Sequence, residues 1–109
     1  MFVRNVTLKL NPDAIKDIPQ VLTNEVLPIL RKQNGFRDEL ICLSLDQTQA
    51  MALSFWDTKE NFDAYARTAR IDVLKALGKL SNGNLTEEPM ELYLSTIHKL
   101  TASQTTAKA

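Results

Sequence analysis

Residues 34–65 constrain the fold more than any other part of the chain. Gly35 follows a helical pattern and marks its end, because glycine takes the left-handed conformation beyond a helix C-terminus at little cost. Two short apolar segments, 40–45 and 50–56, then flank a polar turn at 46–49, which predicts a hairpin. The second segment runs directly into another helical pattern. The order helix, hairpin, helix determines most of the topology of a small α+β domain.

The two ends of the domain show the alternation that is typical of strands. Apolar residues recur at every second position over residues 2–10, and a similar alternation runs over residues 90–100. Period-two alternation predicts half-buried strands. The predicted fold is therefore ferredoxin-like, βαββαβ, with an antiparallel four-stranded sheet and helices on one face. We expect one domain over residues 1–100 and a flexible C-terminal tail over 101–109, where no large apolar residue occurs.

Both helical patterns carry recognisable start and stop signals. Before the first, Asn11 is placed to cap the helix and Pro12 to open it, whereas Pro19 and Pro28 remove backbone donors and predict a break near one of them. The second is expected to begin with Asp57 as its cap, to bend near residue 68 and to end in a loop at 81–84. These signals predict two interrupted helices that pack on the sheet.

Charge and cysteine usage exclude several classes of protein. Thirteen basic residues balance thirteen acidic ones and are scattered, so we expect no nucleic-acid partner. No window reaches the ~20 apolar residues of a membrane span, and residues 1–5 do not resemble a signal peptide. The single cysteine, Cys42, lies in a predicted strand and is expected to be a buried thiol. A cytoplasmic location is the simplest expectation.

The sheet face without helices predicts a partner. Val3, Tyr93 and Ile97 fall on that face in the predicted strands, and two helices cannot cover both sides of a sheet. An exposed apolar face of this size marks an interaction surface. We expect a homodimer that packs sheet against sheet.

The order of landmarks resembles a known family. Asn34-Gly35-Phe36, a hairpin, and the run from Phe55-Trp56-Asp57 to Phe62 are similar to the antibiotic biosynthesis monooxygenase family, over about residues 1–100. The resemblance implies a dimeric α/β barrel. It leaves the activity open, because the family includes cofactor-free quinone-forming oxygenases, heme-degrading enzymes and members without known activity.

The heme-degrading branch can be compared with this chain residue by residue. Its members carry an Asn on the first strand, where alignment places Arg4, and a Trp on the second helix, where Tyr65 stands. They also carry a heme-ligating His further along that helix, and residues 71–80 contain none. The comparison argues against heme degradation.

Few residues suggest chemistry. The chain has one histidine and no metal-binding or phosphate-binding motif, so no metal or nucleotide cofactor is expected. Arg4 and His98 both interrupt apolar strand faces, at strand ends that the topology brings together. They are either solvated strand ends or the catalytic polar corner of a pocket, where Arg4 holds an oxyanion and His98 moves a proton. The substrate-binding candidates are Trp56, Phe62, Tyr65 and Asn5.

Two functions remain open. The resemblance implies a cofactor-independent monooxygenase that acts on a small aromatic or polyketide-like substrate bound between sheet and helices. Trp56, Phe62 and Tyr65 would line that pocket, although their spacing is also ordinary for a packed core. The alternative is a non-catalytic small-ligand-binding or structural dimer. A wide pocket with a convergent Arg or His favours the enzyme, and a solidly packed interface favours the alternative.

Overall fold

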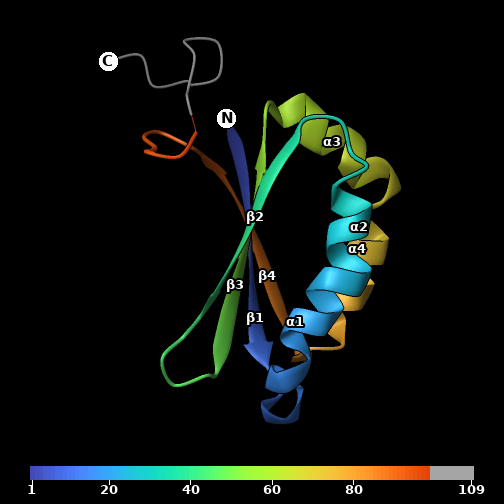
Figure 1. Cartoon of the computed structure of the whole chain (residues 1–109), viewed down its shortest axis with the longest axis vertical. Coiled ribbons are helices and arrows are strands. Elements are labelled where there is room, and N and C mark those ends of the chain that lie inside the picture. Colours follow the sequence, from blue (N-terminus) through green and yellow to red (C-terminus); the bar gives the residue numbers. More distant parts are fainter. Residues whose placement is uncertain (99–109) are drawn as a thin grey trace.

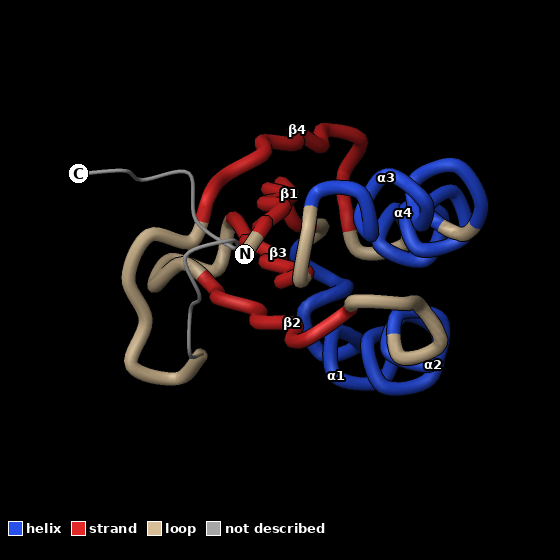
Figure 2. The backbone as a smooth tube through the Cα atoms, turned by 90° about the horizontal axis from the view of Figure 1, so that it is seen from above, coloured by secondary structure: helices blue, strands red, loops and turns tan. Residues whose placement is uncertain are grey.

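The computed structural model describes residues 1–98, so the predicted tail at 101–109 lies outside the described residues. Four antiparallel strands, ordered β2-β3-β1-β4, form one sheet. All helical segments lie on one side of it (Figure 1). The view from above shows the sheet curling around this side (Figure 2). The predicted α+β, ferredoxin-like arrangement is confirmed. The strands are β1 (Phe2–Leu10), β2 (Phe36–Leu43), β3 (Gln49–Trp56) and β4 (Ser81–Glu91).

The first helical layer is broken, as its prolines predict. Asn11 accepts a hydrogen bond from the backbone of Asp13, and both Pro19 and Pro28 stand at the start of a short α segment, where a missing N–H costs little. Gly35 ends the layer with φ +79°, and a Cβ there would lie 2.3 Å from the Asn61 side chain. Its segments are the 3₁₀ helix η1 (Pro12–Asp17), α1 (Ile18–Val21), the π-helical η2 (Leu22–Val26) and α2 (Leu27–Leu30).

The second helical layer comprises α3 (Lys59–Thr68) and α4 (Arg70–Gly78), which meet at the predicted bend. The predicted cap, Asp57, is wrong by one residue. Thr58 is the N-cap, and its hydroxyl accepts from the Asn61 backbone N–H. Asp57 instead accepts from Arg37 Nη2 at 2.7 Å, so its carboxylate ties β2 to the end of β3.

The last strand lies earlier than its pattern predicts. β4 pairs with β1 from Ser81 opposite Leu10 to Glu91 opposite Phe2, so the predicted loop at 81–84 belongs to the strand and the predicted strand at 90–100 is wrong. Gly83 takes φ +107° beside a register shift in this pairing, which explains why turn-forming residues occur there. β4 is a polar edge strand, so hydrophobic alternation does not reveal it.

The main core lies between the sheet and the helices. Trp56 is completely buried there, and Phe2 and Leu8 of β1 pack in the same cluster. A smaller cluster of Met1, Val3 and Phe55 lies on the outer sheet face. In the part of the chain that is described, no helix is long and apolar enough to cross a membrane.

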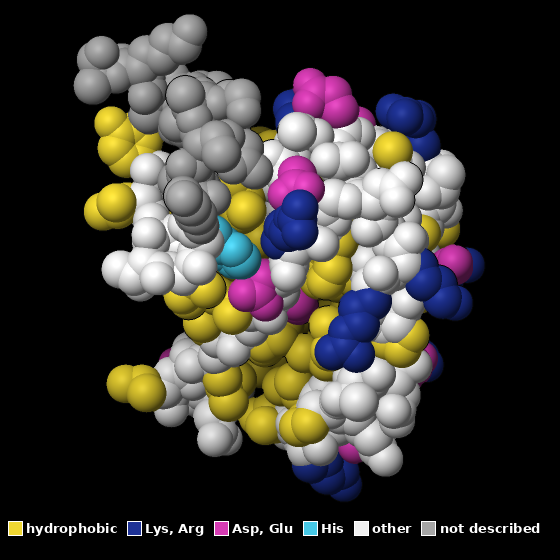
Figure 3. All heavy atoms as spheres, turned by 45° about the horizontal axis from the view of Figure 1, so that its top comes forward, with side chains coloured by type: hydrophobic (Ala, Val, Ile, Leu, Met, Phe, Trp, Pro, Cys, Tyr) yellow, Lys and Arg dark blue, Asp and Glu magenta, His cyan; other side chains and the backbone are white. Residues whose placement is uncertain are grey.

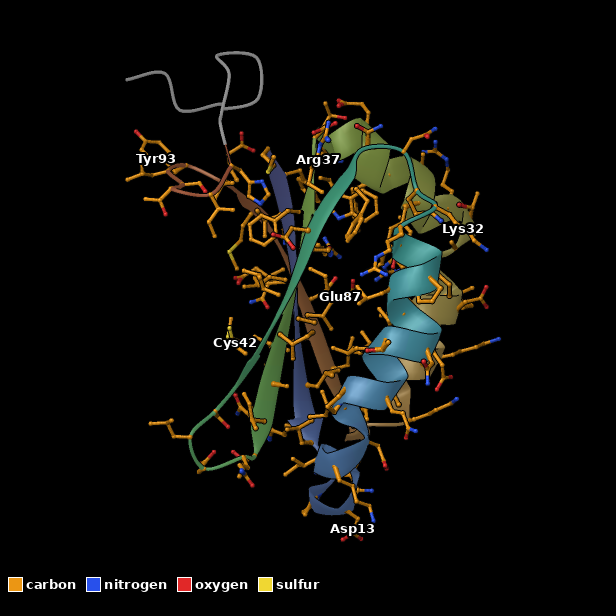
Figure 4. The ribbon with its side chains drawn as sticks, in the orientation of Figure 1. Asp13, Lys32, Arg37, Cys42, Glu87 and Tyr93 are labelled. Carbon is orange, nitrogen blue, oxygen red and sulfur yellow. The ribbon has the colours of Figure 1, made fainter. Side chains whose placement is uncertain are left out.

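Cys42 corrects one sequence expectation. Its thiol is exposed, not buried, because β2 is an edge strand and no helix covers its outer face. Figure 4 shows the side chain pointing away from the helices.

Candidate functional site

A row of polar side chains crosses the helix-facing side of the sheet. Glu39 of β2 lies opposite Ser54 of β3, and Ser54 lies opposite Arg4 of β1. Glu87 of β4 completes the row, opposite Val6. Neighbouring strands are ~4.8 Å apart, so the row spans the sheet in a few short steps. The row therefore places a polar side chain from every strand on the face that carries the main apolar core.

The strongest ionic contacts of the row join β1, β4 and α4. Arg4 Nε and Arg70 Nε each donate to Glu87 Oε2 at 3.2 Å, and Arg70 Nη2 also contacts Glu87 Oε1. All three side chains are largely buried, with Glu87 14% exposed. Figure 4 shows Glu87 between the sheet and the helices. Two guanidinium groups share one carboxylate, so this cluster carries one net positive charge.

Aromatic rings form the upper wall of the same space. The rings of Trp56 and Tyr65 stack with centroids 4.8 Å apart, and Phe62 meets Trp56 edge-on at 5.7 Å. The Arg4 guanidinium carbon lies 5.2 Å from the centre of the Phe62 ring, within cation–π range. Trp56 Nε1 donates to Ser54 Oγ at 2.9 Å, which satisfies the buried indole. The aromatic wall and the cationic cluster are therefore in direct contact.

The electrostatic environment of Glu39 differs from that of Glu87. Burial raises the pKa of Glu39 to about 8, and the neighbouring Asp38 carboxylate adds to the rise. Burial also raises the pKa of Tyr65, where Glu39 adds to the rise and Arg70 opposes it. Tyr65 thus responds to charges on both sides of the row. Glu39 thus holds its proton more tightly than an ordinary carboxyl does, although it faces the same layer as the ionic cluster.

The free space at this site is small. Arg4, Arg70, Glu87, Phe62 and Tyr65 are among the residues that line a cavity of about 30 Å³. That volume suits about one water molecule, so an aromatic ligand needs the helices to shift. Figure 3 shows hydrophobic side chains gathered in a hollow along the middle of the molecule, with charged side chains at its rim.

A larger hollow of about 620 Å³ lies at the opposite end of the sheet, where Lys9, Asp46 and Asn82 are among its lining residues. It is lined by the polar β2–β3 turn and by residues of β1, η1, β3 and β4, without aromatic side chains. Ligand pockets usually combine a hydrophobic or aromatic lining with a few convergent polar groups. The smaller cavity has that chemistry, so we take it as the site despite its volume.

Of the predicted site residues, the structure brings Arg4, Trp56, Phe62 and Tyr65 together. It does not bring His98 to Arg4, so that predicted pairing is wrong. The His98 ring lies 5.4 Å from the Phe55 ring, and its Nε2 lies 3.5 Å from Asp38 Oδ2. Phe55 belongs to the outer-face cluster, opposite to the face that Arg4 occupies. β4 ends at Glu91, and the chain then leaves the sheet. The strand alternation therefore does not extend to His98 and cannot predict which face its side chain occupies.

Asn5 also lies away from the helix-side cavity. It stands opposite Leu53 and Glu88, in the phase of β1 that faces outward. The side chain is buried, and its Oδ1 has no hydrogen-bond partner among the described residues. Asn5 therefore does not line the helix-side cavity of about 30 Å³. Its amide oxygen is a hydrogen-bond acceptor without a partner on the outer face.

Glu39, Ser54, Arg70 and Glu87 are the site residues that sequence reasoning missed. A usable signal existed for Glu39, because extending the alternation of Ile41 and Leu43 back by two positions places it on the helix-facing side. Glu87 had no such signal, since its strand was not recognised. Arg70 follows the helix bend and resembles an ordinary surface residue in the sequence.

Comparison with solved structures supports the fold. A monooxygenase from the gene ActVA-Orf6 of Streptomyces coelicolor, bound to nanaomycin D, superposes with TM-score 0.67 at 23% identity, over 90% of this chain and 92% of that chain. A candidate antibiotic biosynthesis monooxygenase from Deinococcus radiodurans gives 0.68 at 18% identity, over 87% and 95% of the two chains. A variant of MhuD with two manganese protoporphyrin IX molecules per active site gives 0.69 at 14% identity, over 88% and 98%.

Comparison of sequences finds no match, whereas comparison of structures does. No family model matches the chain, and no curated protein sequence matches it. The predicted resemblance is confirmed at the level of three-dimensional structure by several solved structures. The chain has the fold of the antibiotic biosynthesis monooxygenases.

Proposed function

We propose that this protein is a monooxygenase that binds a small aromatic substrate between the sheet and α3–α4 and needs no metal or organic cofactor. The observation that carries the proposal is the contact between the aromatic wall and the cationic cluster, where Arg4 lies against Phe62 and shares Glu87 with Arg70. An electron-rich phenol has both a ring for the wall and an acidic oxygen for the guanidinium groups. Two similar solved structures hold nanaomycin D and manganese protoporphyrin IX, which supports a ligand site in this fold.

In the proposed reaction the substrate itself reduces O₂. In an anthrone, the keto form of such a phenol, the ring CH₂ group becomes a carbonyl, one atom of O₂ enters the product, and the other leaves as water. All four electrons come from the substrate, so no external reductant is required. The protein's contribution is to exclude water and to stabilise the deprotonated substrate with fixed positive charge. Arg4 and Arg70 supply that charge, and the helices supply the cover.

A second candidate function is non-catalytic binding of a small ligand, or a purely structural role. The observation that favours it is the cavity of about 30 Å³, which the closed helices leave too small for an aromatic ring. Under this alternative the polar row fixes the helices on the sheet. The two candidates differ in whether an aromatic phenol binds and whether O₂ is then consumed.

Oxygen uptake tests the proposal directly. Chelator-treated protein is mixed with an anthrone in air, and O₂ consumption and ¹⁸O₂ incorporation are recorded. The proposal predicts uptake above the rate without protein, with one ¹⁸O atom in the product. Arg70→Met should lose most of this activity, whereas Lys79→Met, which removes the surface ion pair to Glu25, should not. Binding without oxygen uptake would support the non-catalytic alternative instead.

We also propose that the outer sheet face joins two copies of the chain. Leu40, Met51 and Met90 are exposed on this face, next to the cluster of Met1, Val3 and Phe55. The unsatisfied oxygen of Asn5 is an acceptor that a partner could use. The chain's own residues 92–98 cover part of the face, since His98 and Leu92 pack on the cluster.

Sedimentation at micromolar concentration tests the dimer. The proposal predicts twice the 12.3 kDa mass of the chain. A folded monomer under these conditions would remove the outer face as an interface between copies.

The exposed thiol of Cys42 is consistent with a reducing compartment, which supports a cytoplasmic location for the protein.

A further inference from the structure

We propose that Glu39 is the proton-transfer residue of the helix-side site, where it takes the proton of a phenolic or enolic ligand. Arg4 and Arg70 then hold the oxyanion. This inference rests on the proposed function, since it assigns the step that creates the oxidisable anion. Three observations support it: the position of Glu39 in the sheet, its lack of a structural partner, and the arrangement of charges around it.

The position of Glu39 is set by strand register. It lies opposite Ser54, whose hydroxyl accepts from the Trp56 indole in the buried layer beneath the helices. Side chains directly opposite one another on antiparallel strands share a face. Glu39 therefore faces the same layer as the aromatic wall, two strands away from Arg4.

Among the described residues, the Glu39 carboxyl has no partner that would explain it as a structural group. Within residues 1–98, no hydrogen bond or ion pair to this carboxyl is found, although the side chain is partly buried. Glu87, in the same layer, holds two arginines. A buried carboxyl that serves stability is normally hydrogen-bonded. Glu39 is thus available to a ligand in a way that Glu87 is not.

The surrounding charges are arranged for proton transfer. Tyr65 of α3 lies within electrostatic range of both Glu39 and Arg70 of α4. The cationic cluster of Arg4, Arg70 and Glu87 faces the layer from β1, α4 and β4, and Asp38 is the charged neighbour on β2 itself. From β3, the residue opposite Glu39 is Ser54, which carries no charge. Carboxyls in contrasting environments commonly divide acid–base and electrostatic roles.

The step balances without a further reagent. The ligand O–H bond breaks, an O–H bond forms on the Glu39 carboxylate, and the electron pair stays on the ligand oxygen. The one net positive charge of the cationic cluster then faces the new anion. Burial raises the pKa of Glu39 to about 8. This reduces the difference from the pKa of a phenol, ~10, and so makes proton transfer from the phenol to Glu39 less unfavourable.

The inference can be tested without oxygenation by using 4-nitrophenol, an electron-poor phenol that is already ionised above pH 8. Its affinity is measured from pH 7 to 10 by calorimetry in two buffers with different ionisation enthalpies, which also gives the number of protons taken up. A bound phenolate and the Glu39 carboxylate in the same buried layer repel each other, so binding of the phenolate favours the protonated form of Glu39. Above pH 8, binding to the wild-type chain should weaken by up to about tenfold per pH unit, with one proton taken up.

Variants separate the carboxyl from the rest of the site. Glu39→Gln should bind with little pH dependence and no proton uptake, while Glu39→Asp should restore both. Asp63→Asn, a surface carboxylate paired with Lys59, should behave as wild type. If Glu39→Gln binds 4-nitrophenol with unchanged proton uptake, the role of Glu39 is overturned and the ligand site stands. If the folded wild-type protein binds none, the proposed function falls as well.

Discussion

The two faces of the sheet differ in how many apolar side chains they bury and in whether their polar groups have partners. On the helix side, the indole of Trp56 and the guanidinium groups of Arg4 and Arg70 all have partners. On the outer side, the amide oxygen of Asn5 has none, and Leu40 remains exposed. A face on which the helices fix the arginines in place can organise charges around the unpaired Glu39 carboxyl for a ligand. A face that it leaves incomplete is better explained by a second protein surface.

Two acidic neighbours, Asp38 and Glu39, lie on different faces of the sheet. Asp38 points outward and meets His98, whereas Glu39 points inward and faces the aromatic wall. The two residues are adjacent in sequence, and strand alternation alone sends them to opposite sides. The same alternation separates Arg4 from Asn5 on β1. Substitutions at such pairs can therefore probe one face without altering the other.

The largest expected effect is on the helix side. Trp56→Ala should lower the free energy of unfolding by ~3–5 kcal/mol, because a completely buried ring is lost and a cavity remains. Leu40→Ala on the outer face, where the side chain is 38% exposed, should cost under ~1 kcal/mol in the isolated chain. Urea denaturation of both variants measures the contrast. Equal losses would mean that the two faces do not differ in packing.

The next effect concerns the cationic cluster. Glu87→Gln leaves two largely buried guanidinium groups without their carboxylate and should cost about 3 kcal/mol. Asp63→Asn breaks the exposed pair with Lys59 and should cost ~0–1 kcal/mol. Thermal and urea unfolding at low salt test both changes. A Glu87→Gln variant as stable as Asp63→Asn would show that the cluster is effectively solvated.

A smaller effect depends on pH. The pKa of Glu39 rises from its ordinary 4.5 to about 8 in the folded chain, so the folded state binds this proton more tightly than the unfolded state. Its contribution to stability is full below about pH 4.5 and is lost as the pH rises through 8. Between pH 6 and 8 the free energy of unfolding should fall by about 2 kcal/mol. Glu39→Gln should remove that slope, and an unchanged slope would assign it to another group.

The smallest change in folding stability is expected on the outer face, where association should respond instead. Leu40→Lys should weaken the dimer at least about tenfold, since a charge would be buried at the interface, while the chain itself loses under ~1 kcal/mol. Leu45→Lys in the fully exposed β2–β3 turn is the matched control. Sedimentation across a concentration series gives both dissociation constants. The interface is elsewhere if the two variants dissociate alike.

The parts of the fold that follow from local chemistry were predictable. The alternation of β1, the left-handed Gly35 and the proline breaks all depend on a residue and its immediate neighbours. The strand that ends at Trp56 was predictable for the same reason. Local rules also gave the bend between α3 and α4, where Ala69 ends one helix and begins the next.

The rest depended on contacts that a single sequence does not display. β4 carries glutamates inward because Glu87 meets two arginines from distant segments, so its sequence lacks the expected hydrophobic pattern. His98 was misplaced because the alternation near the C-terminus continues beyond the end of the strand. The sequence predicts Asp57 as a cap, but the contact with Arg37 that engages its carboxylate depends on the pairing of β2 with β3. Half of the site was missed for this reason.

The central claim is that the helix-side row, and not the outer face, receives the ligand. A crystal structure of the protein with bound 4-nitrophenol tests it most directly. The account predicts the ring beside Phe62 and Tyr65, with its oxygen within hydrogen-bond distance of Arg4 or Arg70 and of Glu39, and with α3–α4 displaced outward to make room. A ligand seated on the outer face against Phe55 and His98, with the helix-side cavity still closed, would contradict it.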